Sequence, residues 1–109
     1  MRLPGDADVK VTQYSLRLFV AGNTVRSQRA IENLRIIVRD YLSGLVDLEV
    51  IDLYQQPELA ERYQVVAAPT LVKLQPLPVR RIIGDLSQMD RVLRGLELSA
   101  HPQDDPLDA

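Results

Sequence analysis

The chain has 109 residues with a formal net charge of −2, and 46% of its residues are hydrophobic while 26% are charged. This length and composition predict one compact domain, because the chain is too short for two cores and too apolar for disorder. The small negative charge provides no basic field for nucleic acid or anionic lipid, so neither nucleic acid nor a membrane is an expected partner.

The first predicted elements are a strand and a long helix. Residues 1–12 are predicted to be a flexible N-terminal extension. Residues 13–20 alternate apolar and other side chains at the period of a strand with one face better buried than the other. Thr24 can cap the helix that follows, because its hydroxyl accepts an otherwise free backbone N–H. Ser43 and Gly44 are predicted to end this helix, whose apolar residues recur at helical spacing: Ala30, Ile31, Leu34, Ile37, Val38, Tyr41 and Leu42.

The second predicted strand completes a βαβ unit. Val46, Leu48 and Val50 alternate with Asp47 and Glu49, which predicts a strand with a charged outer face. The two carboxylates could in principle perform acid–base chemistry. A spacing of two on a strand favours the simpler interpretation, in which both side chains face solvent.

The remaining elements are shorter. A proline begins a predicted helix over 57–63. Residues 70–74 and 79–83 are rich in β-forming residues and are separated by prolines, which fit a hairpin or a sheet edge better than a central strand. Ser87 and Asp90 resemble a capping box for a last helix that continues to residue 98. Residues 100–109 are predicted to be a disordered acidic tail.

No enzyme site can be assembled from these residues. The chain has no cysteine, which excludes disulfides and thiol chemistry, and its single histidine, His101, lies in the tail, so no metal or cofactor is expected. Residues 22–24 could hold an anion at the helix start, but a turn with an N-cap is favoured. Arg80 and Arg81 either grip a phosphate or a carboxylate-rich partner, or face opposite sides of a strand and are solvated. No apolar run is long enough for a signal peptide or a membrane span, so we expect a cytoplasmic protein.

Three motifs resemble the KaiB family of small circadian-clock proteins. They are Leu-Phe-Val-Ala-Gly-Asn-Thr at 18–24, Ala-Pro-Thr-Leu at 68–71 and Pro-Leu-Pro-Val-Arg-Arg-Ile-Ile-Gly-Asp-Leu at 76–86. The resemblance runs without a gap from about residue 14 to residue 98, so we expect a KaiB-like domain over residues 13–99.

The resemblance implies an α/β, thioredoxin-like fold of the order βαβ-α-ββ-α. Family members are also metamorphic, which implies an alternative ground-state fold of the C-terminal half. Gly95 matches a glycine whose replacement favours the binding form, and Glu97 stands where aspartate is usual. The residues expected to take part in fold switching are Pro69, Pro76, Pro78, Gly95 and Glu97.

The resemblance further implies a binding protein. KaiB-like proteins attach to the N-terminal ATPase ring of the KaiC hexamer, displace the SasA kinase and sequester KaiA. Arg29 matches a family arginine implicated in partner contact, and Gln64 replaces a common lysine. The candidate partner-binding residues are Arg29, Gln64, Arg80 and Arg81. Acidic residues on the second strand, where family members often carry alanine and lysine, count against KaiA binding. A homotetramer or a dimer is expected.

Three other interpretations stay open at this point. The chain could be a KaiB-like module that serves a non-KaiC signalling partner. It could be a sensor module like the N-terminal domain of SasA, although no kinase region follows, which favours a free-standing protein. A thioredoxin-like enzyme is the third, and the absence of cysteine argues against it.

Overall fold

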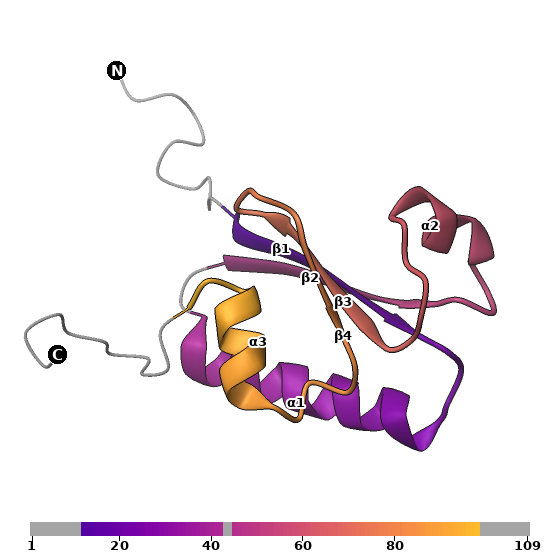
Figure 1. Cartoon of the computed structure of the whole chain (residues 1–109), viewed down its shortest axis with the longest axis horizontal. Coiled ribbons are helices and arrows are strands. Elements are labelled where there is room, and N and C mark those ends of the chain that lie inside the picture. The colour runs from indigo at the N-terminus through magenta and orange to yellow at the C-terminus, as the bar shows by residue number, and fades with distance from the viewer. Residues whose placement is uncertain (1–11, 43–44, 99–109) are drawn as a thin grey trace, which may run out of the picture.

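The computed structural model describes residues 12–42 and 45–98, which form a four-stranded sheet with helices on both faces (Figure 1). The strand order is β2-β1-β3-β4, with β1 and β2 parallel and the other two pairs antiparallel. The elements are β1 (Thr12–Val20), α1 (Val25–Tyr41), β2 (Leu45–Asp52), α2 (Pro57–Arg62), β3 (Thr70–Gln75), β4 (Arg80–Ile83) and α3 (Met89–Gly95). This is the predicted α/β order.

Two predicted terminal segments lie almost wholly outside the described residues. The tail over 100–109 and most of the extension over 1–12 belong there, as do Ser43 and Gly44, the predicted end of the first helix. Thr12 was assigned to the extension but is the first residue of β1. None of the helices in the described part is long and apolar enough to cross a membrane.

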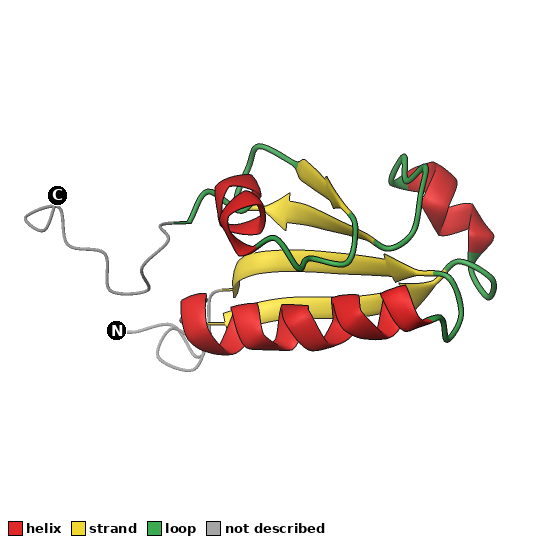
Figure 2. Ribbon diagram, turned by 60° about the horizontal axis from the view of Figure 1, so that its bottom comes forward, coloured by secondary structure: helices red, strands yellow, loops and turns green. Residues whose placement is uncertain are grey.

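Strand β1 lies inside the sheet and is buried on both faces. Leu16 and Leu18 on one face and Phe19 on the other are fully buried. The predicted difference between its faces is present, because Leu16, Leu18 and Val20 are all buried on one face, whereas Arg17 on the other face is partly exposed and pairs with the half-exposed Asp47 and Glu49. α1 and α3 cover the first face, whereas α2 packs against the second near the end of the sheet (Figure 2).

Helix α1 begins as the sequence predicts. The Thr24 hydroxyl accepts the Ser27 backbone N–H at 3.1 Å and caps the helix. Ala30, Leu34 and Ile37 form its buried stripe against the sheet. This spacing of three and four residues places the side chains on one helical face.

Strand β2 differs from the prediction because it is an edge strand. Leu48 and Val50 were expected on a buried face, but they are 36% and 45% exposed. α1 covers the middle of the sheet and leaves this edge open. The hairpin prediction holds for β3 and β4, although β3 lies between β1 and β4 and is buried, so β4 alone of these two strands is at an edge of the sheet.

Helix α3 does not begin with the predicted capping box. Its N-cap is Gln88, which makes no capping hydrogen bond through its side chain. Ser87 instead donates its backbone N–H to Asp85 Oδ1 at 3.1 Å, which closes a local turn before the helix. The predicted apolar face is present, since Val92, Leu93 and Leu96 are buried.

The face of the sheet under α3 contains a buried charge. Lys73 on β3 is the one charged side chain fully buried in the core of the described residues. Its ammonium lies 3.0 Å from Glu97 Oε1, just after α3, and the Glu97 side chain is 44% exposed. A buried ammonium needs a partner, because an unpaired charge in an apolar environment is costly. The ion pair therefore ties the end of α3 to β3.

The contact between α3 and β4 leaves no room for a side chain at position 95. A Cβ placed on Gly95 would lie 2.6 Å from Ile82 Cδ1 and 2.8 Å from Ile82 Cγ1. Ile82 is buried, so it has little space to move. The family resemblance implies that replacement of Gly95 favours the binding form, whereas this contact opposes replacement in the described fold.

We expect Glu97→Gln to lower the free energy of unfolding by about 2 kcal/mol, because it leaves the Lys73 ammonium buried without a carboxylate. The solvent exposure of the Glu97 side chain keeps this decrease smaller than it would be for a fully buried ion pair. In a Lys73→Met background the same substitution should change stability by less than about 0.5 kcal/mol. Urea denaturation of the four proteins measures this coupling. An equal loss in both backgrounds would contradict the role assigned to the ion pair.

We expect Gly95→Ala to destabilise the described fold by about 1 kcal/mol, because repacking Ile82 costs more than the gain in helix propensity. In an Ile82→Ala background, which removes both contacting atoms, the same change should be stabilising. Denaturant titrations of both pairs provide the comparison. A stabilising Gly95→Ala in the parent chain would show that Ile82 moves aside at little cost.

Candidate partner-binding surfaces

The loop between β1 and α1 uses its polar groups to hold the fold together. The buried Ser27 hydroxyl accepts the Ala21 N–H at 3.2 Å and bonds the Thr24 hydroxyl at 2.9 Å. Asp52 Oδ1 accepts the Gly22 N–H at 3.2 Å. Gly22 has a φ of 63°, a conformation that glycine adopts easily. The predicted turn with an N-cap is confirmed, and the N–H groups of Ala21, Gly22 and Ser27 are already bonded within the chain.

Arg81 and Gln64, two predicted partner-binding residues, contact each other. Arg81 donates through Nε to the Tyr63 carbonyl at 3.0 Å and through Nη2 to Gln64 Oε1 at 3.3 Å. Both side chains remain exposed. They fasten the end of α2 to β4, and together they form one small polar surface on that face of the sheet.

Arg80 points to the opposite side of β4. Its guanidinium lies 3.9 Å from Glu97 Oε2, beside the ion pair that Lys73 makes. Burial raises the pKa of the nearby Tyr14 phenol, and the Glu97 carboxylate raises it further. Adjacent arginines thus face opposite sides, as strand geometry predicts, but each is engaged with the chain's own groups.

Arg29 lies apart from the other three, on the exposed side of α1. It borders a shallow hollow with Asn23, Val25, Gln28 and Glu32, and Val25 is 67% exposed. Arg29 has no ion pair with any described residue. The four predicted partner-binding residues therefore occupy three separate places instead of one site.

The three prolines expected to take part in fold switching flank β3. The peptide bonds Ala68–Pro69, Gln75–Pro76 and Leu77–Pro78 are all cis. The Pro69 carbonyl accepts the Gly84 N–H at 2.9 Å, which joins the loop before β3 to the end of β4. Leu77, in the β3–β4 loop, is 76% exposed. Their role in fold switching stays a prediction.

The acidic edge strand is neutralised in part by its neighbour. Arg17 Nη2 lies 3.1 Å from Asp47 Oδ2, and Arg17 Nε lies 3.3 Å from Glu49 Oε1. Arg17 also donates to the Asp47 carbonyl at 3.1 Å. The two carboxylates are about half exposed, as predicted, and share one arginine, so the group has a net charge of −1.

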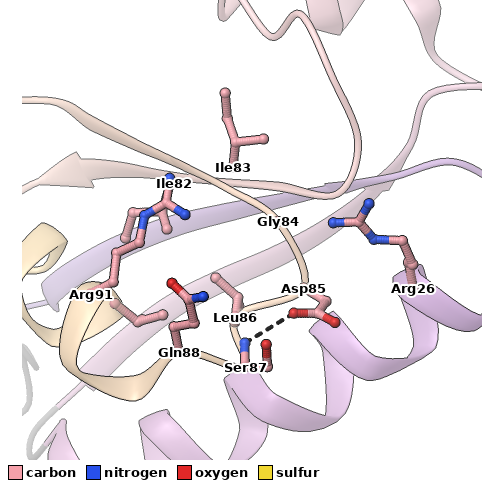
Figure 3. Close-up of a pocket in the computed structure, with 10 residues that line it drawn as sticks. Arg26, Ile82, Ile83, Gly84, Asp85, Leu86, Ser87, Gln88 and Arg91 are labelled. Atoms are coloured by element: carbon pink, nitrogen blue, oxygen red, sulfur yellow. Dashed lines mark hydrogen bonds between the residues drawn. The ribbon is translucent and has the colours of Figure 1, made fainter.

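The structure contains a cavity that the sequence analysis did not identify. It has a volume of about 340 Å³ and lies between α1, α3 and the loop that joins β4 to α3 (Figure 3). Arg26, Asp85 and Arg91 contribute its charges. Hydrogen bonds from Ser87 hold the pKa of Asp85 below its usual value, and Arg26 and Arg29 lower it further. Spacing along the sequence gave no signal, because these side chains come from three separate elements.

No group of three histidine, cysteine, aspartate or glutamate residues in the described part is placed to hold a metal ion. The surfaces above consist of guanidinium groups, amides and exposed aliphatic side chains. Such groups are typical of protein recognition.

Solved structures share this fold. The N-terminal domain of SasA from Synechococcus elongatus matches with a TM-score of 0.64 and 27% identity, over 80% of this chain and 86% of that one. Mitochondrial thioredoxin 3 from Saccharomyces cerevisiae also has a TM-score of 0.64, with 20% identity over 84% of this chain and 83% of that one. The fold is thus thioredoxin-like, as predicted.

Sequence comparison identifies the family. The family model of the KaiB domain matches residues 17–98. The circadian clock oscillator protein KaiB of Prochlorococcus marinus strain MIT 9312 is 53% identical over 85 residues, which cover 78% of this chain and 81% of that protein. The KaiB of Synechococcus sp. strain RCC307 is 54% identical, over 78% of this chain and 77% of that protein. The chain belongs to the KaiB family of circadian clock proteins, which are regulatory proteins and not enzymes.

Proposed function

We propose that this protein binds the N-terminal ATPase ring of a KaiC-type hexamer and modulates its phosphorylation and output, in circadian timing or in a related timer or stress response. The observation that carries this proposal is the thioredoxin-like form of the described residues, which is the form that family resemblance associates with KaiC binding. The likeness to the N-terminal domain of SasA supports the same kind of partner. A SasA-like kinase would then compete for the ring.

The surface around Arg29 is the best candidate for the main contact. Its guanidinium is exposed, it has no ion pair with a described residue, and the exposed Val25 lies beside it. An unpaired arginine next to an apolar side chain is a common composition for an interface hot spot. Arg81 and Gln64 would form a second contact whose geometry is already fixed by their mutual hydrogen bond.

KaiA is not part of this proposal. The β2 edge presents Asp47 and Glu49, and their shared pairing with Arg17 leaves a negative charge there. A partner that had evolved to meet lysine at this edge would face like charge or leave a charge unpaired, which costs several kcal/mol.

We further propose that the chain forms a homo-oligomer, a tetramer or a dimer, in an alternative packing of its C-terminal half. A rise in protein concentration increases the population of the conformation that assembles into an oligomer. Binding of a partner increases the population of the conformation described above. The Gly95–Ile82 contact and the Lys73–Glu97 ion pair would both break in such a rearrangement, because each joins α3 to the β3–β4 hairpin.

We expect this protein to co-elute with a KaiC-type hexamer, in ATP or in ADP. Arg29→Ala should weaken the complex by about tenfold or more, because the loss of an interface arginine removes a charge-assisted contact. Arg35→Ala, on the exposed side of the same helix, is the matched control and should leave affinity unchanged. Size exclusion with light scattering and a binding titration measure both effects.

A well-folded protein that forms no complex in either nucleotide would overturn the proposal. That result would favour the alternative, in which the KaiB-like fold serves a non-KaiC signalling partner. Equal weakening by Arg29→Ala and Arg35→Ala would mean that general charge, and not the Arg29 surface, governs the interaction.

A further inference from the structure

The cavity between α1, α3 and the β4–α3 loop has two guanidinium groups on its rim. Arg26 lies in the first turn of α1 and Arg91 lies on α3, and both side chains line the cavity (Figure 3). Arg26 Nη2 lies next to Gly84, within 3.9 Å of where a Cβ on that residue would be. Neither arginine forms an ion pair or a side-chain hydrogen bond with another described residue. Both are therefore available to an incoming group within the part of the chain described.

The position of Arg26 does not serve the stability of the helix. It is the second residue of α1, where the helix dipole presents partial positive charge, and the first turn has no acidic residue. A cation at this end of a helix is unfavourable by a few tenths of a kcal/mol at the surface. Because the positive charge of Arg26 does not stabilise the start of the helix, it points to a contact with a group outside α1.

The cavity is held in shape before any ligand arrives. Asn33 on α1 donates to the Asp85 carbonyl at 2.8 Å and ties the β4–α3 loop to the helix. The loop closes on itself through the hydrogen bond from Ser87 to Asp85. Buried Ile82, Leu86 and Val92 form an apolar lining. A preorganised site loses less conformational entropy on binding.

The charges of the cavity favour a single carboxylate. Arg26 and Arg91 can each offer forked donors, and the planar carboxylate suits that geometry. Asp85 adds a negative charge beside Arg26, which disfavours a doubly charged phosphate, and its carboxylate can accept a backbone N–H. The apolar lining offers space for an aliphatic neighbour, and a volume of about 340 Å³ is at the lower end for ligand sites.

We propose that this cavity binds an acidic segment of a partner protein, with a glutamate or aspartate carboxylate between Arg26 and Arg91, an aliphatic side chain on the apolar lining and a backbone N–H donated to Asp85. The cavity shares no lining residue with the hollow beside Arg29, although Arg29 is close enough to Asp85 to lower its pKa, and the proposal does not depend on which protein supplies the segment. The result of a KaiC-binding experiment therefore does not decide whether this cavity binds an acidic segment.

The test uses isotope-labelled full-length protein and amide chemical shifts. The probe is a blocked five-residue peptide with one glutamate between two leucines, and the glutamine version is its control. We expect saturable shifts over residues 26 and 83–91 with the glutamate peptide, and about tenfold weaker binding of the glutamine peptide. Arg26→Gln and Arg91→Gln should each weaken binding by a similar factor. Arg35→Gln, on α1 outside the cavity, should not.

Two further probes distinguish the source of the anion. Sodium acetate should shift the same amides only at much higher concentration, because it lacks the peptide backbone and the aliphatic neighbour. Inorganic phosphate should bind more weakly than the glutamate peptide. Equal binding of the two peptides, tighter binding of phosphate, or the absence of localised shifts would each overturn the proposal.

Discussion

The whole structure depends on the burial of β1 on both faces. This strand pairs with β2 on one side and β3 on the other, while Leu16 and Phe19 project to opposite faces and are fully buried. Neither layer alone can cover such a strand, so α1 and α3 are required on one face and α2 on the other. The same requirement brings the N-terminal turn of α1 close to the β4–α3 loop, where the cavity lies.

Sequence periodicity predicted the elements that have one exposed side. α1 shows this best, since Ala30, Leu34 and Ile37 are buried and its Thr24 cap is present. The same reasoning failed for β2, because alternation reports which side chains share a face but not whether a helix covers that face. It also failed at Ser87, because this residue closes a turn with Asp85 and the helix starts one residue later, after the N-cap Gln88.

The candidate sites were harder to predict than the fold. Strand geometry correctly placed Arg80 and Arg81 on opposite faces, but their partners come from distant segments, Tyr63 and Gln64 for one and Glu97 for the other. Contacts of this kind depend on the tertiary arrangement, which a local pattern does not contain. The buried ammonium of Lys73 is a similar case, because a lysine in a strand normally indicates exposure.

The ion pairs of Arg17 on β1 with Asp47 and Glu49 on β2 also restrict how the β2 edge can change in evolution. The single guanidinium of Arg17 serves both Asp47 and Glu49, so the three residues form one electrostatic unit across two strands. A lysine introduced at position 49 alone would place two cations side by side and leave Asp47 to balance both. The fitness effect of each residue therefore depends on the other two. Lineages that exchange the acidic edge for a basic one are expected to change position 17 as well, and grafting single residues from a relative should fail where grafting all three succeeds.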